Sequence, residues 1–169
     1  HPATTITSTN GGAISLQGTG GTTTGYKEAI WGAGSSGAVV NAGSANLTLI
    51  GSGAINLTGV ALAAGAASVN AGTSDIILSN ASNNFTGTVS ATGANVTIIN
   101  GNAIELGAVF ASGTIDIATL AGDLTLTGAI STTNTSTNAI TLNAAKNAVA
   151  GAAAGGQIVV SGGTLATGA

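Results

Sequence analysis

The sequence predicts an all-β protein, a right-handed parallel β-helix (β-solenoid) with about 19–20 residues in each coil. Three observations predict this fold. An apolar–polar–apolar triplet recurs along the chain, the triplets return at intervals of about 20 residues, and the side chains are small. Gly takes 28 of 169 positions and aromatic residues only 2%. The right-handed sense is a property of this class of folds and does not follow from the spacing.

The triplets have the pattern of short strands with one buried and one solvated face, because apolar residues alternate with mostly polar ones. Each strand is too short to form a stable hairpin alone, so the strands must stack. The triplets are residues 14–16, 47–49, 55–57, 76–78, 96–98, 104–106, 115–117, 124–126, 140–142 and 158–160.

The spacing of the triplets predicts how the strands stack. Two series of strands share one period, which is expected when each period is one coil and equivalent strands pair in parallel. The intervals are 20 residues from Ile76 to Val96, 19 from Val96 to Ile115, 20 from Ile104 to Leu124 and 18 from Ile140 to Ile158.

Longer intervals predict loops that leave the coils. One covers residues 131–138, and the other covers the Ala- and Gly-rich stretch 60–73. Further strands at 109–111 and 85–89 give each coil three faces, with Gly and Asn at the corners because they tolerate a positive φ.

The organisation along the chain is one continuous solenoid with a different beginning. Residues 1–40 depart from the pattern and predict an N-terminal strand and cap-like segment with an irregular insertion. Residues 41–169 predict the solenoid repeats.

The charge balance excludes several classes of protein. Lys27 and Lys146 are the only basic side chains besides His1, whereas nucleic-acid binding needs a stripe of Lys and Arg. No apolar run reaches the roughly 20 residues of a membrane-spanning helix.

Cys is absent, which excludes disulfides and thiolate metal sites. The start at His1 predicts a processed or excised piece.

Similar short motifs rich in Asn, Gly and Thr recur in the second half of the chain, at Asn83–Ser90, Gly93–Asn100, Asn102–Gly107, Gly122–Ile130 and Asn138–Asn143. They resemble the filamentous-haemagglutinin-like large exoproteins, which are adhesins of two-partner secretion. The resemblance covers about residues 40–169 and implies secretion through an outer-membrane partner, a long β-helical shaft and an adhesive role on the bacterial surface. Passenger domains of autotransporters share this fold and remain an alternative.

The scarcity of reactive side chains predicts a non-catalytic protein with no catalytic residue, no cofactor and no metal site. We expect a structural shaft or subunit of an extracellular adhesin or filament. The competing class is a polysaccharide-binding or polysaccharide-degrading β-helix, in which Asp116 and Asp123 would be the paired carboxylates. Outward Thr rows would suit ice binding, but Asn and charged residues interrupt them.

The ends of the rod are the candidate contact surfaces. The C-terminal stretch 157–169 has no charge, no Pro and no amphipathic cap, so we expect either that the chain continues or that another copy covers this edge. The partner is then the protein itself, the rest of a longer shaft, or surface glycans. The candidate subunit-contact or cap residues are Thr5, Ile6, Thr7, Tyr26, Lys27 and Trp31.

Two interpretations of the 26–31 segment stay open. It is a lid formed by a short amphipathic turn, or a binding anchor, since Tyr and Trp are frequent interface residues. Glycosylation is also compatible with the sequence, although the number of Asn-x-Ser/Thr sites is close to what composition gives by chance. These sites are Asn46, Asn56, Asn80, Asn84, Asn95 and Asn134.

Overall fold

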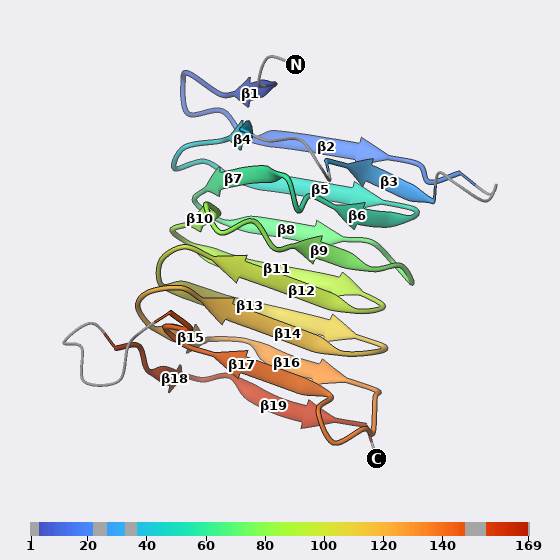
Figure 1. The fold of residues 1–169 in the computed structure, drawn as a ribbon, viewed down its shortest axis with the longest axis vertical. Helices are drawn as coiled ribbons and strands as arrows, with labels where there is room; N and C mark the ends of the chain where they lie inside the picture. The colour runs from blue at the N-terminus through green and yellow to red at the C-terminus, as the bar shows by residue number, and fades with distance from the viewer. Residues whose placement is uncertain (1–3, 22–26, 33–36, 148–154, 169) are drawn as a thin grey trace.

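The computed structural model describes residues 4–21, 27–32, 37–147 and 155–168, and their regular elements are all β-strands (Figure 1). Every strand pairs in parallel with its neighbours. The predicted parallel β-solenoid is therefore confirmed. The described residues contain no helix of the length and hydropathy that crossing a membrane requires.

The strands form three sheets that wrap around one axis, and each pass of the chain around that axis is one coil. The four-stranded sheet, in spatial order, contains β1 (Thr5–Thr7), β4 (Ala38–Asn41), β7 (Val60–Ala64) and β10 (Asn84–Phe85). The six-stranded sheet contains β3 (Glu28–Trp31), β6 (Ala54–Asn56), β9 (Ile76–Leu78), β12 (Val96–Asn100), β14 (Ile115–Thr119) and β17 (Ile140–Asn143).

The nine-stranded sheet runs the full length of the rod. Its path contains β2 (Ile14–Gly18), β5 (Leu47–Gly51), β8 (Ala67–Asn70), β11 (Thr88–Gly93), β13 (Ile104–Ala111), β15 (Leu124–Leu126) and β18 (Ile158–Val160). Beside this path, β16 (Ala129–Thr132) pairs with β13, and β19 (Thr164–Thr167) pairs with β16.

The register confirms most of the predicted period. Ile76 pairs with Val96, and Val96 pairs with Ile115. The expected step from Ile140 to Ile158 is wrong, because Ile158 pairs with Leu124 in the nine-stranded sheet. The 18-residue interval joins strands on two different faces, which spacing alone does not distinguish.

The Ala- and Gly-rich stretch 60–73 is not the predicted loop. It forms β7 and β8, and its alternate residues Val60, Leu62 and Val69 are buried. Ala residues face outward at the positions between Val60 and Ala64, so the alternation of apolar and polar residues is hidden in the sequence. The 131–138 loop is largely confirmed, since β16 ends at Thr132 and β17 begins at Ile140.

The cross-section of the rod changes along its length. The four-stranded sheet ends at β10. In the following coil, Gly101 N donates to Asn83 O of the coil before it, and the chain continues directly into the long strand β13. The first forty residues also contribute strands to the stack, because β1, β2 and β3 each pair with the equivalent strand of the next coil.

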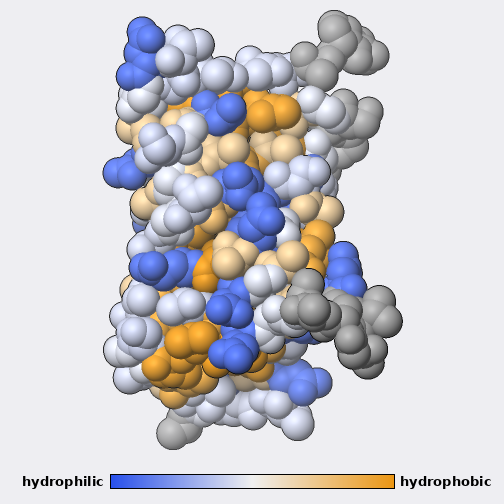
Figure 2. Space-filling model, turned by 90° about the vertical axis from the view of Figure 1, so that its left-hand side faces the viewer, coloured by the Kyte–Doolittle hydropathy of each residue, from blue (hydrophilic) through white to orange (hydrophobic). Residues whose placement is uncertain are grey.

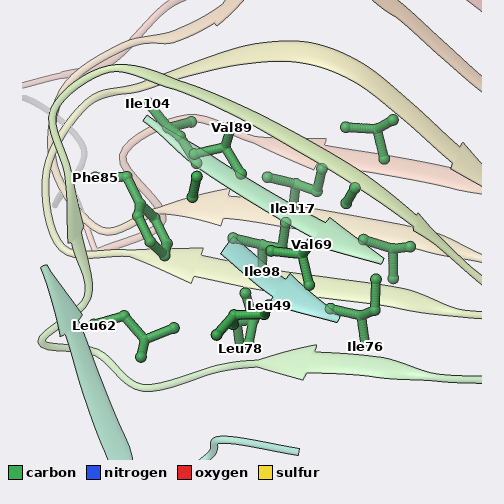
Figure 3. Packing of buried hydrophobic residues seen from close by; sticks show 14 of the residues in the cluster. Leu49, Leu62, Val69, Ile76, Leu78, Phe85, Val89, Ile98, Ile104 and Ile117 are labelled. Atoms are coloured by element: carbon green, nitrogen blue, oxygen red, sulfur yellow. The ribbon is translucent and has the colours of Figure 1, made fainter. Parts of the chain in front are cut away.

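The core is a column of aliphatic side chains between the sheets (Figure 3). Leu49, Leu78, Ile98 and Ile117 are fully buried, and Phe85 is the largest buried side chain. Leu78, Ile98 and Ile117 occupy equivalent positions in successive coils. Aliphatic side chains thus fill a narrow interior that repeated large rings would overpack.

Polar side chains complete the hydrogen bonding at the corners of the core. The fully buried Asn100 accepts from Phe85 N at 2.9 Å through Oδ1 and donates from Nδ2 to the carbonyls of Asn102 and Ala103 at 3.1 and 2.9 Å. Asn83 likewise accepts from Leu62 N at 2.9 Å. Among the described residues, no buried side-chain polar atom lacks a partner.

Candidate functional site

A ladder of hydrogen bonds, which runs from Asp75 through Asn95 to Thr114, follows one corner of the rod between the nine- and six-stranded sheets. Asp75 Oδ1 accepts from Asn95 N at 3.1 Å and from Asn95 Nδ2 at 2.9 Å. Asn95 Oδ1 in turn accepts from Thr114 N at 2.8 Å. Asp75 and Asn95 each bond to a residue of the next coil, so these side chains join successive coils.

Two other acids also bridge coils. Glu105 Oε1 accepts from the hydroxyls of Thr88 at 2.6 Å and Thr127 at 3.3 Å, which belong to the coils on either side. Asp123 Oδ1 accepts from Gln157 N at 2.9 Å. These contacts use three of the chain's five acidic side chains as ties between neighbouring coils.

The carboxylates of the competing enzyme hypothesis lie on different sheets. Asp116 is an exposed residue of β14, in the six-stranded sheet, where it lies between Thr97 and Thr141. Asp123 precedes β15 of the nine-stranded sheet. The described part of the chain also contains no group of three His, Asp or Glu side chains that could hold a metal ion.

The N-terminal end of the rod brings two of the candidate contact residues together. Ile6 and Trp31 line one hollow with the inward-facing Leu16 and Ile30. Trp31 is 65% exposed. Residues 28–31 form strand β3 at the edge of its sheet, not the amphipathic turn of the lid interpretation.

The other N-terminal candidates are arranged around that hollow. Thr5 and Thr7 lie in β1, whose three residues are all exposed and which pairs, within the described part of the chain, with β4 alone. Lys27 is exposed immediately before β3. Tyr26 lies outside the described residues. The assignment of this end as a contact surface stays a prediction.

The C-terminal end carries a second apolar hollow, which the sequence indicated only through its lack of charge. Ile140, Leu142, Ile158 and Leu165 line it together with residues 166 and 167. Figure 2 shows apolar surface gathered toward the lower end of the face it presents, where the C-terminal strands lie.

Most Asn side chains of the Asn-x-Ser/Thr sites make hydrogen bonds within the fold. Asn56, Asn80 and Asn134 each accept from the backbone N–H two residues later. Asn84 accepts from Asn102 Nδ2, and Asn95 belongs to the hydrogen-bond ladder that begins at Asp75. Asn46 is exposed before β5. Glycosylation stays a prediction at all six.

A shallow depression on the nine-stranded sheet was not found from the sequence. It is lined by Asn46 and by hydroxyls of three successive strands, Thr48, Ser68, Thr88 and Ser90. The register of the strands brings these hydroxyls side by side, because Thr48 pairs with Ser68 and Ser68 pairs with Ser90. On the six-stranded sheet, Ile77 and Asp116 flank Thr97, so no continuous Thr row for ice binding forms there.

Comparison with known proteins identifies the repeat. Residues 32–92 and 93–156 each match the family described as repeats of unknown function (DUF5649). Searches of curated proteins and of solved structures gave no match. The two matches are contiguous, and each of them spans about 60 residues, which is about three coils of about 20 residues. Since they cover most of its length, the chain belongs to the DUF5649 repeat family.

Proposed function

We propose that the chain is a non-catalytic shaft segment of an extracellular bacterial surface protein of the filamentous-haemagglutinin-like kind. The observation that carries the proposal is where the few acidic side chains lie and what they contact. Asp75, Glu105 and Asp123 tie one coil to the next, whereas Asp116 and Asp123 lie on separate sheets. These acidic side chains thus stabilise the stacking of the coils.

The tandem repeat and its continuous core support the same role. A solenoid unit buries its apolar faces against its neighbours, so each added unit lengthens the rod and extends the same core. The resemblance of residues 40–169 to two-partner secretion adhesins supports a location at the cell surface. The apolar hollows at the two ends support self-association end to end or incorporation in a longer shaft.

Turnover of polysaccharides tests the proposal against its enzymatic competitor. The purified chain is incubated with bacterial, plant and host glycans, and release of reducing ends is measured. We expect none. Release that is lost in Asp116→Ala but kept in Glu28→Ala would overturn the shaft proposal, because Glu28 lies apart in β3 and serves as the matched acidic control.

Glycan binding without turnover is the second candidate, and the hydroxyl-lined depression favours it. Hydroxyl and amide groups on three adjacent strands can exchange hydrogen bonds with a sugar. A glycan array of the parent chain and of the double variant Thr48→Val/Ser68→Ala distinguishes the candidates. Binding that both proteins share equally would exclude this depression as the binding surface.

A further inference from the structure

The dipeptide Asn–Gly occurs twice in the chain, at residues 10–11 and 100–101. An Asn that precedes Gly is prone to lose ammonia from its side chain, because the glycine has no Cβ to obstruct the approach of its backbone nitrogen to the Asn carboxamide. Asn is for this reason among the thermolabile residues of proteins. The two copies lie in opposite surroundings, so the fold should decide which of them reacts.

The copy at Asn100–Gly101 is held by hydrogen bonds at both reacting groups. The fully buried Asn100 accepts from Phe85 N through Oδ1 and donates from Nδ2 to neighbouring carbonyls. Gly101 N donates to Asn83 O at 2.7 Å. Reaction of the Asn100 carboxamide with Gly101 N therefore requires this part of the core to open first.

The copy at Asn10–Gly11 lies in the connection between β1 and β2, at the edge of the rod (Figure 1). Both residues are exposed. Within the described part of the chain, Gly11 N makes no backbone hydrogen bond, and no atom lies within 4 Å of a Cβ placed on Gly11. This connection thus leaves the Asn10 carboxamide and Gly11 N free to approach each other.

We propose that Asn10 is a site of spontaneous modification in the folded protein. Gly11 N attacks Asn10 Cγ, the bond between Cγ and Nδ2 breaks, and Nδ2 leaves as ammonia with the proton that Gly11 N gives up. Water then opens the succinimide ring at one of its two carbonyl carbons. The product at position 10 is aspartate or isoaspartate, and water is the only co-reactant.

The modification changes the charge of the β1–β2 connection and leaves the core intact. Each event adds one carboxylate to a chain that has five acidic side chains and a formal net charge of −3. In isoaspartate the backbone also passes through Cβ, which lengthens the connection by one carbon. This inference is independent of the proposed shaft role, since it rests on the surroundings of the two dipeptides.

Peptide mapping measures the two sites separately. Trypsin cleaves after Lys27 and Lys146, so Asn10 falls in the peptide 1–27 and Asn100 in the peptide 28–146. The chain is incubated in weakly alkaline buffer, folded or unfolded in guanidinium chloride, and then digested and analysed by tandem mass spectrometry. We expect Asn10 to react within about threefold of its unfolded rate, and Asn100 at least about a hundredfold more slowly than its own unfolded rate.

Two results would overturn the proposal. One is a folded-state rate at Asn10 more than about tenfold below its unfolded rate, which would show that the fold protects this site as well. The other is an equal folded-state rate at Asn10 and Asn100, which would show that their different surroundings do not govern the reaction.

The control variant is Asn10→Gln, whose longer side chain would form a larger ring that closes more slowly. Asn10 is the only Asn in residues 1–27, so the mass gain of this peptide should disappear in the variant. A gain that persists would assign the reaction to Gln17 and refute the site. Isoaspartyl methyltransferase should methylate the peptide 1–27 from the incubated parent and not from the variant, and equal methylation of both would contradict modification at Asn10.

Discussion

Buried asparagine side chains replace backbone hydrogen bonds where the chain turns between sheets. At such a corner the carbonyl and amide groups no longer face an equivalent strand, and a buried group without a partner is costly. Asn100 satisfies one amide and two carbonyls of the neighbouring segments. Its amide is therefore part of the core although its chemistry is polar.

Asn100→Ala should lower the free energy of unfolding by about 1–3 kcal/mol, because it leaves the buried Phe85 N without its partner and removes the bonds to the part-buried carbonyls of Asn102 and Ala103. Urea denaturation followed by circular dichroism measures the change. Asn102→Ala is the control, since its exposed side chain makes one bond to Asn84 and should cost less than about 1 kcal/mol. Equal losses would mean that burial of Asn100 is unimportant.

The two phenylalanines form a second matched pair. Phe85 is 1% exposed in the core and Phe110 is 44% exposed on the outer face of β13. Phe85→Ala should cost about 3–5 kcal/mol through lost burial and the cavity that remains. Phe110→Ala should cost less than about 1 kcal/mol. Urea midpoints compare them, and a larger loss at Phe110 would contradict the arrangement of β13.

At the scale of the strands and turns, glycine permits the close approach of successive coils. A Cβ on Gly128 would collide with the backbone of Gly107 in the preceding coil, and one on Gly163 would lie 2.7 Å from Gly128 O. These glycines stack because the turn brings backbone against backbone with no space for a side chain.

Gly128→Ala should therefore destabilise the protein by about 1–3 kcal/mol, as overpacking does. Gly155→Ala is the control, because nothing lies within 4 Å of its added Cβ, and it should be neutral or stabilise by about 0.4–1 kcal/mol. Thermal denaturation of the two variants ranks them. A Gly128→Ala protein as stable as the parent would show that the coils separate more easily than their contacts indicate.

Alternation of residue type was sufficient to predict most strands. All ten triplets overlap an observed strand, because Ile, Leu or Val at alternate positions can be buried on one side only. β7 was missed because its outward residues Ala61 and Ala63 are apolar, which removes the contrast between the two faces. β8 was missed because one of its two inward residues is the small Ala67, so Val69 is its single large aliphatic residue. Face assignment failed at Ile158, since a spacing near one period also arises between neighbouring faces when the connecting segments differ in length.

The candidate site was less predictable than the strands. The lack of charge in residues 157–169 predicted an apolar surface, but the hollow between Ile140 and Ile158 depends on which sheet each strand joins. The hollow shared by Ile6 and Trp31 also arises between strands on different faces. Both hollows depend on how strands from different sheets pack together, which the local sequence pattern does not reveal.

For the whole molecule, stability should fall from the middle of the rod toward its ends. Each coil is stabilised mainly by its immediate neighbours, and the end coils have a neighbour on one side only. Hydrogen exchange followed by mass spectrometry should show at least about tenfold slower exchange in β9, β11 and β12 than in β1, β2, β18 and β19. Uniform exchange along the chain would indicate that the rod opens as a single unit.

The direction of the hydrogen bonds also governs how the rod responds to tension. β1 lies at one end and β19 at the other, and the bonds between coils run along the axis that joins them (Figure 1). A pull on the two ends loads the bonds of the terminal coil first, so the rod should peel coil by coil. Releasing about 20 residues extends the chain by about 60–70 Å. A tethered rod of this kind would lengthen many-fold in small steps and so limit the peak force transmitted to whatever its tip holds.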